Sequence, residues 1–240
     1  MLAQTILSPN EHKDICVITT RGEKYGENVN TVPVIADELR SLVTEYPVCL
    51  LKDPNTGRFA LHALTGFDAG ENLFLEGDIW QASYVPLHIL RQPFMIGIKD
   101  KEGAEPTPDN TVVTIQLEHK RVTDKGGEAL FDKEGNATNY LNKTSELLAA
   151  LLQGLPRTSS FVDALVKEEL VEQMQLNVKL KNGEQKSFQG FYSINEDKLS
   201  ELKGDVLEKF HSLGYLQACH MLIASFGNIQ KLINKKNASL

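Results

Sequence analysis

Short apolar runs separated by turn residues occupy much of the first half of the chain. The runs at residues 48–52 and 59–66 flank the segment Asp53–Gly57, which reads Asp-Pro-Asn-Thr-Gly. Because proline presets its backbone φ and glycine accepts a positive φ, this segment predicts a β-hairpin turn. A second hairpin is predicted around Lys181–Glu184, since its Asn-Gly pair between two apolar runs favours a tight turn. Strands are also predicted at residues 15–19, 73–75, 94–99, 111–118, 176–180 and 186–194.

Apolar residues recur every three or four positions in the second half, which is the spacing of one helix face. An amphipathic helix is predicted over residues 137–153. It is expected to end at Gly154 and Pro156, because glycine and proline interrupt helices. The C-terminal segment is predicted to be helical, with a break at Gly214. Shorter helices are predicted over residues 33–46, 80–91 and 161–170, the last capped by Ser160.

Hairpins followed by helices predict an α+β fold. We expect a largely antiparallel β-sheet that is built from hairpins and packs against helices, with a helical C-terminal segment. The 240 residues are predicted to form a single domain over 1–240, with a β-rich part at about 1–120 and a helix-rich part at about 136–240. Residues 100–110 are predicted to be a loop. Residues 119–136 are predicted to be a connector or a short hairpin around Gly126 and Gly127.

The charge balance excludes some classes of partner. Lys and Arg number 25 and Asp and Glu 32, so the formal net charge is -7. Binding to nucleic acid or to an anionic membrane needs a basic surface, so neither partner is predicted. No apolar run approaches the roughly 20 residues of a membrane-spanning helix, and the N-terminus lacks the pattern of a secretory signal. The sequence therefore predicts a cytoplasmic protein.

The common catalytic motifs are absent from the sequence. It has neither a phosphate-binding loop nor a nucleophile elbow, so we predict no cofactor. Cys16, Cys49 and Cys219 have apolar neighbours, which is typical of core cysteines. His12 and Asp14 have the spacing of an iron-binding pair, but that site needs a many-stranded barrel. The helical second half does not fit such a barrel, so no metal site is predicted, and His12 and Asp14 are expected at the start of a strand.

One stretch combines the only tryptophan with a tyrosine and an arginine. Trp80, Tyr84 and Arg91 would share one side of the helix predicted over residues 80–91. Such a set can form an aromatic wall with a guanidinium group that holds a carboxylate or a peptide end. With Asn72 just upstream, these four residues are the candidate ligand-binding set. The alternative is that the aromatic residues pack the helix onto the sheet and that Arg91 is exposed or in a salt bridge.

The same stretch carries a resemblance to a known family. Short motifs along nearly the whole chain resemble those of the SapC family of bacterial proteins. In place of Leu90–Gln92 the family pattern has two adjacent basic residues, so this chain lacks one charge there. The motifs are His12–Lys13, Val32–Pro33 with Glu38, Glu45–Val48, Leu64–Phe67, Gly70–Phe74, Trp80, Tyr84–Pro86, Leu90–Phe94, Gly190–Tyr192, Leu199, Leu202, Gly214–Leu216 and Ser225–Ile229.

The resemblance implies a bacterial protein named after a surface-layer locus. Family members also occur near genes for TonB-dependent receptors, flavin-dependent halogenases and cupin-like dioxygenases. Because no catalytic constellation is recognisable, we expect a non-enzymatic binding or accessory protein for a peptide or protein partner in a surface or nutrient-uptake system. The alternative is an enzyme, or an enzyme partner, that modifies peptides or small metabolites in halogenase or dioxygenase gene clusters. A structural component of the surface is a third hypothesis, suggested by the family name.

Overall fold

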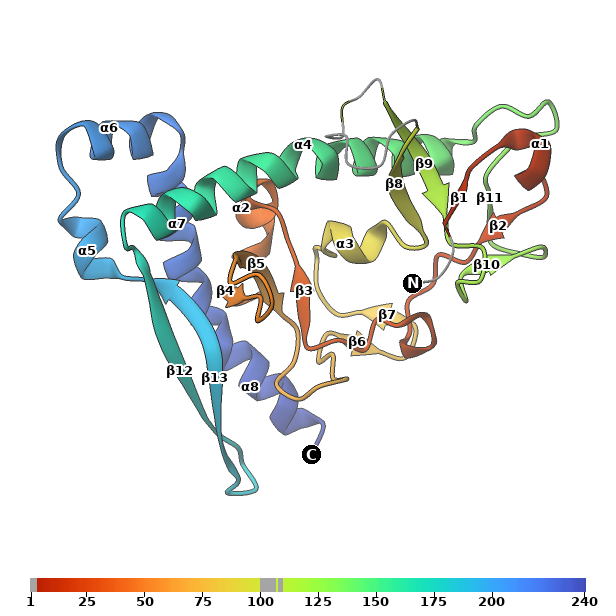
Figure 1. Cartoon of the computed structure of the whole chain (residues 1–240). Coiled ribbons are helices and arrows are strands. Elements are labelled where there is room, and N and C mark those ends of the chain that lie inside the picture. The colour runs from red at the N-terminus through yellow and green to blue at the C-terminus, as the bar shows by residue number, and fades with distance from the viewer. Residues whose placement is uncertain (1–3, 100–106, 108–109) are drawn as a thin grey trace. The chain divides into compact units, whose positions relative to one another are not determined.

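The computed structural model describes residues 4–99, 107 and 110–240 (Figure 1). The described residues divide into two compact units, each assembled from segments that are distant in the sequence. Unit 1 is drawn from Met1–Glu27, Gly77–Ile79 and Leu87–Gln153, and unit 2 from Asn28–Glu76, Trp80–Pro86 and Gly154–Leu240. The single domain with a β-rich and a helix-rich part stays a prediction, whereas the predicted α+β fold class is confirmed by the antiparallel sheets and the helical C-terminal segment.

Unit 1 contains two three-stranded antiparallel sheets. The first has the order β1–β9–β8 and the second the order β10–β2–β11. The strands predicted near residues 15–19, 94–99 and 111–118 are present as β2, β8 and β9. The strand bounds are β1 Thr5–Ile6, β2 Cys16–Val17, β8 Phe94–Ile98, β9 Thr111–Ile115, β10 Val122–Thr123 and β11 Glu128–Ala129. The unit also has the short helices α1 (Pro9–His12), η1 (Glu23–Tyr25) and α3 (Leu87–Leu90).

Residues 119–136 are predicted to be either a connector or a short hairpin around Gly126 and Gly127. The hairpin does not form. Strands β10 and β11 on the two sides of this glycine pair each pair with β2, which lies between them. Gly127 has a φ of +87°, and a Cβ there would lie 2.6 Å from the carbonyl oxygen of Val17. Glycine is therefore required because the chain passes close to the backbone of β2. The pairing is decided by this long-range contact rather than by the local turn signal.

Unit 2 is built on a five-stranded antiparallel sheet of order β12–β13–β4–β5–β3. Both predicted hairpins are confirmed, as β4–β5 and β12–β13. In the first turn Asp53 Oδ1 accepts the N–H groups of Asn55 and Thr56 at 2.8 Å, and Gly57 takes a φ of +71°. In the second turn Gly183 takes a φ of +86°. The bounds are β3 Thr31–Pro33, β4 Val48–Lys52, β5 Phe59–Leu64, β12 Val171–Lys179 and β13 Gln185–Ile194.

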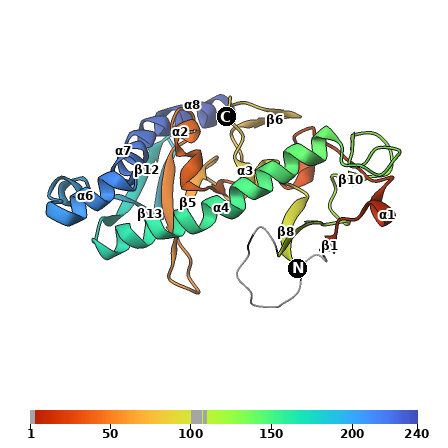
Figure 2. The same cartoon turned by 90° about the horizontal axis from the view of Figure 1, so that it is seen from above.

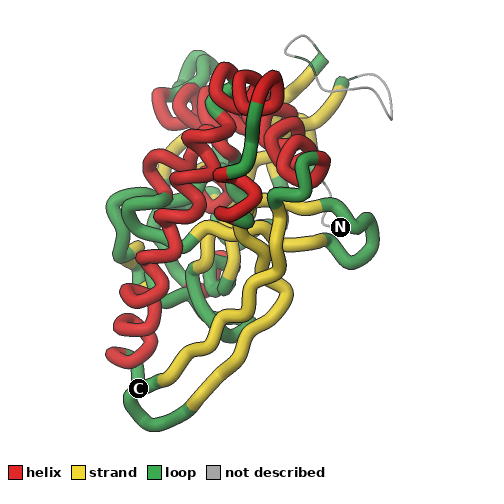
Figure 3. Tube along the Cα trace, turned by 90° about the vertical axis from the view of Figure 1, so that its left-hand side faces the viewer, coloured by secondary structure: helices red, strands yellow, loops and turns green. Residues whose placement is uncertain are grey.

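The C-terminal segment of unit 2 is helical, as predicted. Its helices are α5 (Glu196–Ser200), α6 (Gly204–Ser212), α7 (Tyr215–Ser225), η3 (Phe226–Asn228) and α8 (Ile229–Ala238). The predicted break at Gly214 is present, with a φ of +74°. Helices α7 and α8 run beside the β12–β13 hairpin (Figures 1 and 3). Ser225 Oγ accepts the N–H of Val48 at 2.9 Å, which fixes the end of α7 to the start of β4.

The helix predicted to end at Gly154 and Pro156 does not end there. A single helix, α4, spans Asn139–Lys167 and includes the expected second helix, so Ser160 caps nothing (Figure 2). Proline removes one helix hydrogen bond, but the apolar stripe continues past it. The stripe residues Phe161, Val162 and Leu165 are buried. A proline inside a helix costs about 3 kcal/mol, and burial of three large side chains at about 1.5–3 kcal/mol each outweighs this cost.

Two shorter helices differ from their predictions because of nearby prolines. The helix predicted over 33–46 is reduced to η2 (Ala36–Glu38) and α2 (Leu39–Leu42), since Pro33 belongs to β3. The helix predicted over 80–91 is wrong before Pro86: only α3 forms, and Trp80 ends the strand β7 (Ile79–Trp80). A residue that precedes proline disfavours the helical conformation, so the helix begins after Pro86. The strand predicted at 73–75 is displaced to β6 (Leu75–Glu76).

The loop predicted over residues 100–110 lies mostly outside the described residues. Among the helices that the structure describes, none has the length and the apolar character of a membrane span.

Candidate functional site

Trp80 lies in a buried hydrogen-bond network of unit 2. Its side chain is 8% exposed, and its Nε1 donates to Tyr46 Oη at 2.7 Å. Tyr46 Oη in turn donates to the carbonyl oxygen of Tyr84. The Tyr46 ring packs against Phe74, with 4.5 Å between ring centroids. Burial raises the pKa of Tyr46 above its usual range, so its hydroxyl stays protonated at neutral pH.

Tyr84 extends the same network toward the start of α2. Its Oη donates to Glu38 Oε1 at 3.0 Å, and Glu38 Oε2 accepts the N–H of Ile35 at 3.0 Å. Burial, followed by the charge of Glu38, raises the pKa of Tyr84. Trp80 and Tyr84 are thus brought together through Tyr46, although they do not share a helix face. Their ligand-binding role stays a prediction.

Asn72 and Arg91, the other two candidate residues, belong to different units. Asn72, in unit 2, accepts the N–H of Phe74 on its Oδ1 at 3.0 Å, which is an Asx turn. Arg91, in unit 1, donates from Nη1 to the carbonyl oxygen of Phe94 at 3.0 Å and from Nε to His88 Nδ1 at 3.3 Å. Burial lowers the pKa of Arg91. The ligand-binding role of both residues stays a prediction.

A groove with an apolar floor opens elsewhere in unit 2. It has a volume of about 510 Å³ and lies between η2–α2, the second half of α4 and the start of α7. Its floor includes Phe161, which is 1% exposed, and Tyr215. Their ring centroids are 5.2 Å apart. Leu213 lines the groove and is 52% exposed, so the groove presents apolar surface to solvent.

The rim of this groove is charged. Arg157 forms an ion pair with Asp37 across the groove. Arg40 also lines the rim, and the described part of the chain supplies it with no ion-pair or hydrogen-bond partner. The rim therefore carries one cation in excess, in a chain whose formal net charge is -7. An apolar side chain with a neighbouring anionic group is complementary to such a surface.

None of the four candidate ligand-binding residues lines this groove. The lining residues come from three stretches near residues 36–40, 156–161 and 213–221, which are far apart in the chain. A signal was present at Leu213, where an apolar residue precedes the helix-breaking Gly214. Such a leucine can only be recognised as exposed once the packing of α6 and α7 is known.

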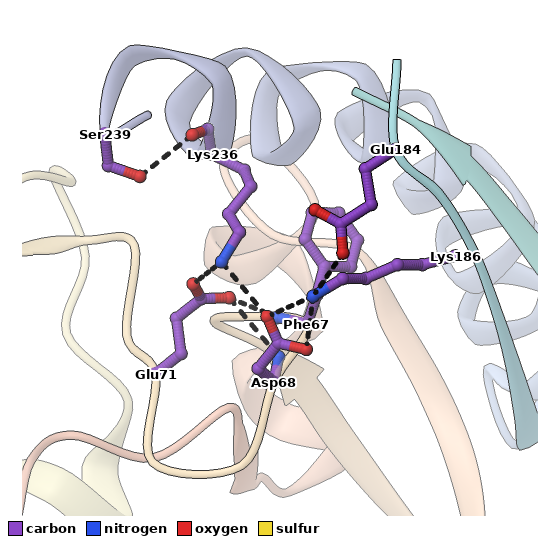
Figure 4. A network of polar contacts seen from close by, with 7 residues as sticks. All are labelled: Phe67, Asp68, Glu71, Glu184, Lys186, Lys236 and Ser239. Carbon is purple, nitrogen blue, oxygen red and sulfur yellow. Dashed lines mark hydrogen bonds and ion pairs between the residues drawn. The ribbon is translucent and has the colours of Figure 1, made fainter. Parts of the chain in front are cut away.

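A second group of charged side chains in unit 2 forms a network of ion pairs (Figure 4). Asp68 pairs with Lys186 at 2.8 Å and with Lys236 at 3.0 Å, and Lys236 also pairs with Glu71. Glu71 Oε2 accepts the N–H of Phe67 at 2.9 Å. The lysines, first Lys186, hold the pKa of Asp68 below its ordinary value. This cluster joins α8, β13 and the loop after β5, and its charges satisfy one another.

Burial sets the environment of two cysteines and of His12. Cys49 and Cys219 are buried, and burial raises the pKa of the Cys219 thiol to about 12 and that of Cys49 further. Such thiols stay protonated and are poor nucleophiles. His12 is buried and its Nδ1 accepts the N–H of Ser8 at 3.0 Å. Within residues 4–99, 107 and 110–240, no three His, Cys, Asp or Glu side chains gather as a metal site.

Comparison with models of protein families shows which family the chain belongs to. The family model SapC matches residues 7–232 of the 240. The chain belongs to the SapC family. No curated protein and no solved structure matches the chain.

Several SapC-like motifs of the sequence coincide with the structural features of unit 2. Tyr46, Trp80 and Tyr84 make the buried network, and they come from three of those motifs. Another of the motifs contributes Gly214 and Tyr215 to the groove. In this member of the SapC family, some motif residues therefore link the segment before β4 to the segment after β7. Other motif residues line the groove.

Proposed function

We propose that the chain is a non-enzymatic binding protein whose groove in unit 2 holds an apolar and acidic segment of a peptide or protein partner. The observation that carries the proposal is the combination of solvent-exposed apolar surface at Leu213 with the cation at Arg40, which pairs with none of the described residues. An exposed leucine beside the aromatic pair Phe161 and Tyr215 gives an anchor point for an apolar side chain. Arg40 supplies a partner for a carboxylate next to that anchor.

The groove is large enough for the anchoring side chains of a partner segment. Its volume of about 510 Å³ lies within the range of about 300–1,000 Å³ that is typical of ligand pockets. The exposed apolar surface at Leu213 and the cation at Arg40, rather than the volume, favour a segment with apolar and acidic side chains. The proposal keeps the broader expectation of an accessory protein in a surface or nutrient-uptake system. The cytoplasmic location also stays a prediction, and fractionation of cells is its test.

Fluorescence anisotropy with two pools of labelled 12-residue peptides tests the proposed groove. One pool combines Leu and Phe with Asp and Glu, and the other combines them with Lys and Arg. We expect the acidic pool to bind more tightly, because the rim has one excess cation. Arg40→Glu should weaken that binding about tenfold, since a favourable charge contact becomes repulsive. Leu213→Asp should weaken it similarly by removing the apolar anchor.

Arg58→Glu is the matched control, because Arg58 is exposed in the β4–β5 turn and makes the same charge change away from the groove. Circular dichroism checks that each variant is folded. Equal binding of the two peptide pools contradicts the proposal, and so does an equal effect of Arg40→Glu and Arg58→Glu. Turnover of a substrate by the purified chain, without a partner, would contradict its non-enzymatic character.

A further inference from the structure

Unit 1 contains a buried ion pair in which two arginines share one carboxylate. Glu27 is 0% exposed and Arg121 is 2% exposed, and Arg121 Nη2 donates to Glu27 Oε1. Arg21 Nη1 donates to the same oxygen at 3.0 Å. Arg121 Nη1 donates to the carbonyl oxygens of Ile18 and Thr20, each at 2.7 Å. These three charged groups therefore carry one positive charge in excess, fixed in place by the backbone near β2.

Two buried polar atoms of this unit have no hydrogen-bond partner among the described residues. They are Arg121 Nε, a donor, and Gln92 Oε1, an acceptor. A buried polar atom without a partner is costly, so a native fold retains few of them. Both residues line one pocket of about 290 Å³. The two atoms themselves have almost no exposed surface. A ligand that offers an acceptor to Arg121 and a donor to Gln92 would satisfy both atoms once the two side chains rotate toward the pocket.

The lining of this pocket selects the charge and the size of such a ligand. Arg21 and Lys143 line it together with Arg121, and no aspartate or glutamate does so in the described part of the chain. Leu90 and Leu147 supply apolar wall. A volume of about 290 Å³ lies at the lower end of the range for ligand pockets. The pocket therefore suits a small anion with an aliphatic part.

We propose that this pocket binds a small aliphatic carboxylate that carries an amide N–H on the atom next to the carboxyl group. The carboxylate accepts hydrogen bonds from Arg121 Nε and lies near Lys143 and Arg21. The neighbouring amide N–H donates to Gln92 Oε1, and the aliphatic part lies against Leu90 and Leu147. A free ammonium group is disfavoured at that position, because three cationic side chains already line the pocket.

Isothermal titration calorimetry of the full chain with three matched probes tests this proposal. N-acetyl-leucine carries the carboxylate and the amide N–H, 4-methylpentanoate carries only the carboxylate, and N-acetyl-leucinamide has the amide but no charge. We expect N-acetyl-leucine to bind at least about tenfold more tightly than either analogue, because only this probe satisfies both orphaned atoms. Equal or undetectable binding of all three probes overturns the proposal.

Two variants separate the roles of the lining residues without disturbing the Glu27–Arg121 pair. Gln92→Leu removes the orphaned acceptor, so it should raise Tm by about 2–4 °C. The same variant should weaken binding of N-acetyl-leucine about tenfold and leave binding of 4-methylpentanoate unchanged. Lys143→Gln should weaken both carboxylates about fivefold and spare N-acetyl-leucinamide.

Lys125→Gln is the control for Lys143→Gln, since Lys125 is exposed and does not line the pocket. An equal effect of the two lysine variants overturns the proposal. A crystal soaked with N-acetyl-leucine that shows only ordered water between Arg121 and Gln92 also overturns it. The residues of this pocket belong to unit 1 and those of the groove to unit 2, so either proposal can fail while the other stands.

Discussion

A buried tryptophan or tyrosine needs a partner for its polar atom, and this requirement explains the place of Trp80. Its indole N–H donates to Tyr46 Oη, and Tyr46 Oη donates to the carbonyl oxygen of Tyr84. The network joins the segment before β4 to the segment after β7. At the residue scale, the aromatic side chains of this stretch thus stabilise the fold through their hydrogen bonds.

Tyr46→Phe is expected to lower the free energy of unfolding by about 1–3 kcal/mol, because Trp80 Nε1 is left buried without an acceptor. Urea denaturation at neutral pH measures this change. Tyr192→Phe is the matched control, since Tyr192 is half-buried and its hydroxyl has no hydrogen bond among the described residues. That control should change the free energy by less than about 0.5 kcal/mol. Equal stability of the two variants would show that the network contributes nothing.

At the scale of elements, α4 is held to η2 by a close approach at Gly154. A Cβ at Gly154 would lie 2.4 Å from Ile35 Cδ1, and Ile35 is buried. Thr158 Oγ1, one turn later, accepts the N–H of Ala36 at 2.8 Å. The glycine that suggests a helix end therefore serves helix packing instead. The helix continues because its next turns bury apolar side chains.

Gly154→Ala is expected to destabilise the fold by about 1 kcal/mol, since overpacking of about 1–3 kcal/mol exceeds the gain of about 1 kcal/mol in helix propensity. Ile35→Val removes the clashing methyl group, so the double variant should be more stable than the sum of the single effects predicts. Urea denaturation of the three variants measures this coupling. Gly227→Ala, where a Cβ meets no atom within 4 Å, is the control and should not destabilise the fold.

For the molecule as a whole, the polar cluster around Asp68 fixes the C-terminal helix to the rest of unit 2. Lys236 of α8 pairs with Asp68 and Glu71 of the loop after β5, while Lys186 of β13 pairs with Asp68. These pairs raise the pKa of both lysines and lower that of Asp68. The contacts between α8, β13 and the loop after β5 thus depend on charged groups that titrate outside the neutral range.

The contribution of Asp68 to stability should disappear in acid. Because its folded pKa lies below the unfolded value of about 3.9, the contribution is complete above that value and is lost as pH falls through the folded pKa. Asp68→Asn should therefore cost up to about 1 kcal/mol at pH 7, since the aspartate is partly exposed, and nothing near pH 2. Urea denaturation at both pH values measures the difference. The exposed Asp124→Asn should show no such pH dependence; an equal profile for both variants contradicts the prediction.

The sequence by itself determined the features that depend on a few neighbouring residues. The turns at Asp53–Gly57 and Lys181–Glu184 follow from local φ preferences and side-chain hydrogen bonds, and so does the break at Gly214. The α+β class follows from these hairpins and from the helical periodicity of the C-terminal segment. Membership of the SapC family was also visible in the motifs spread along the chain.

Only the tertiary structure decided the features that depend on burial and long-range pairing. Pro156 carries a local signal to end a helix, which burial of the stripe at Phe161 overrides. Trp80 takes a strand conformation because Pro86 delays the helix and a distant tyrosine satisfies its N–H. The groove at Leu213 and the pocket at Arg121 each unite residues from distant segments. Local preferences amount to about 1 kcal/mol for most residues and about 3 kcal/mol for a proline inside a helix. Burying each large apolar side chain contributes about 1.5–3 kcal/mol, so the packing of several side chains decides where the two conflict.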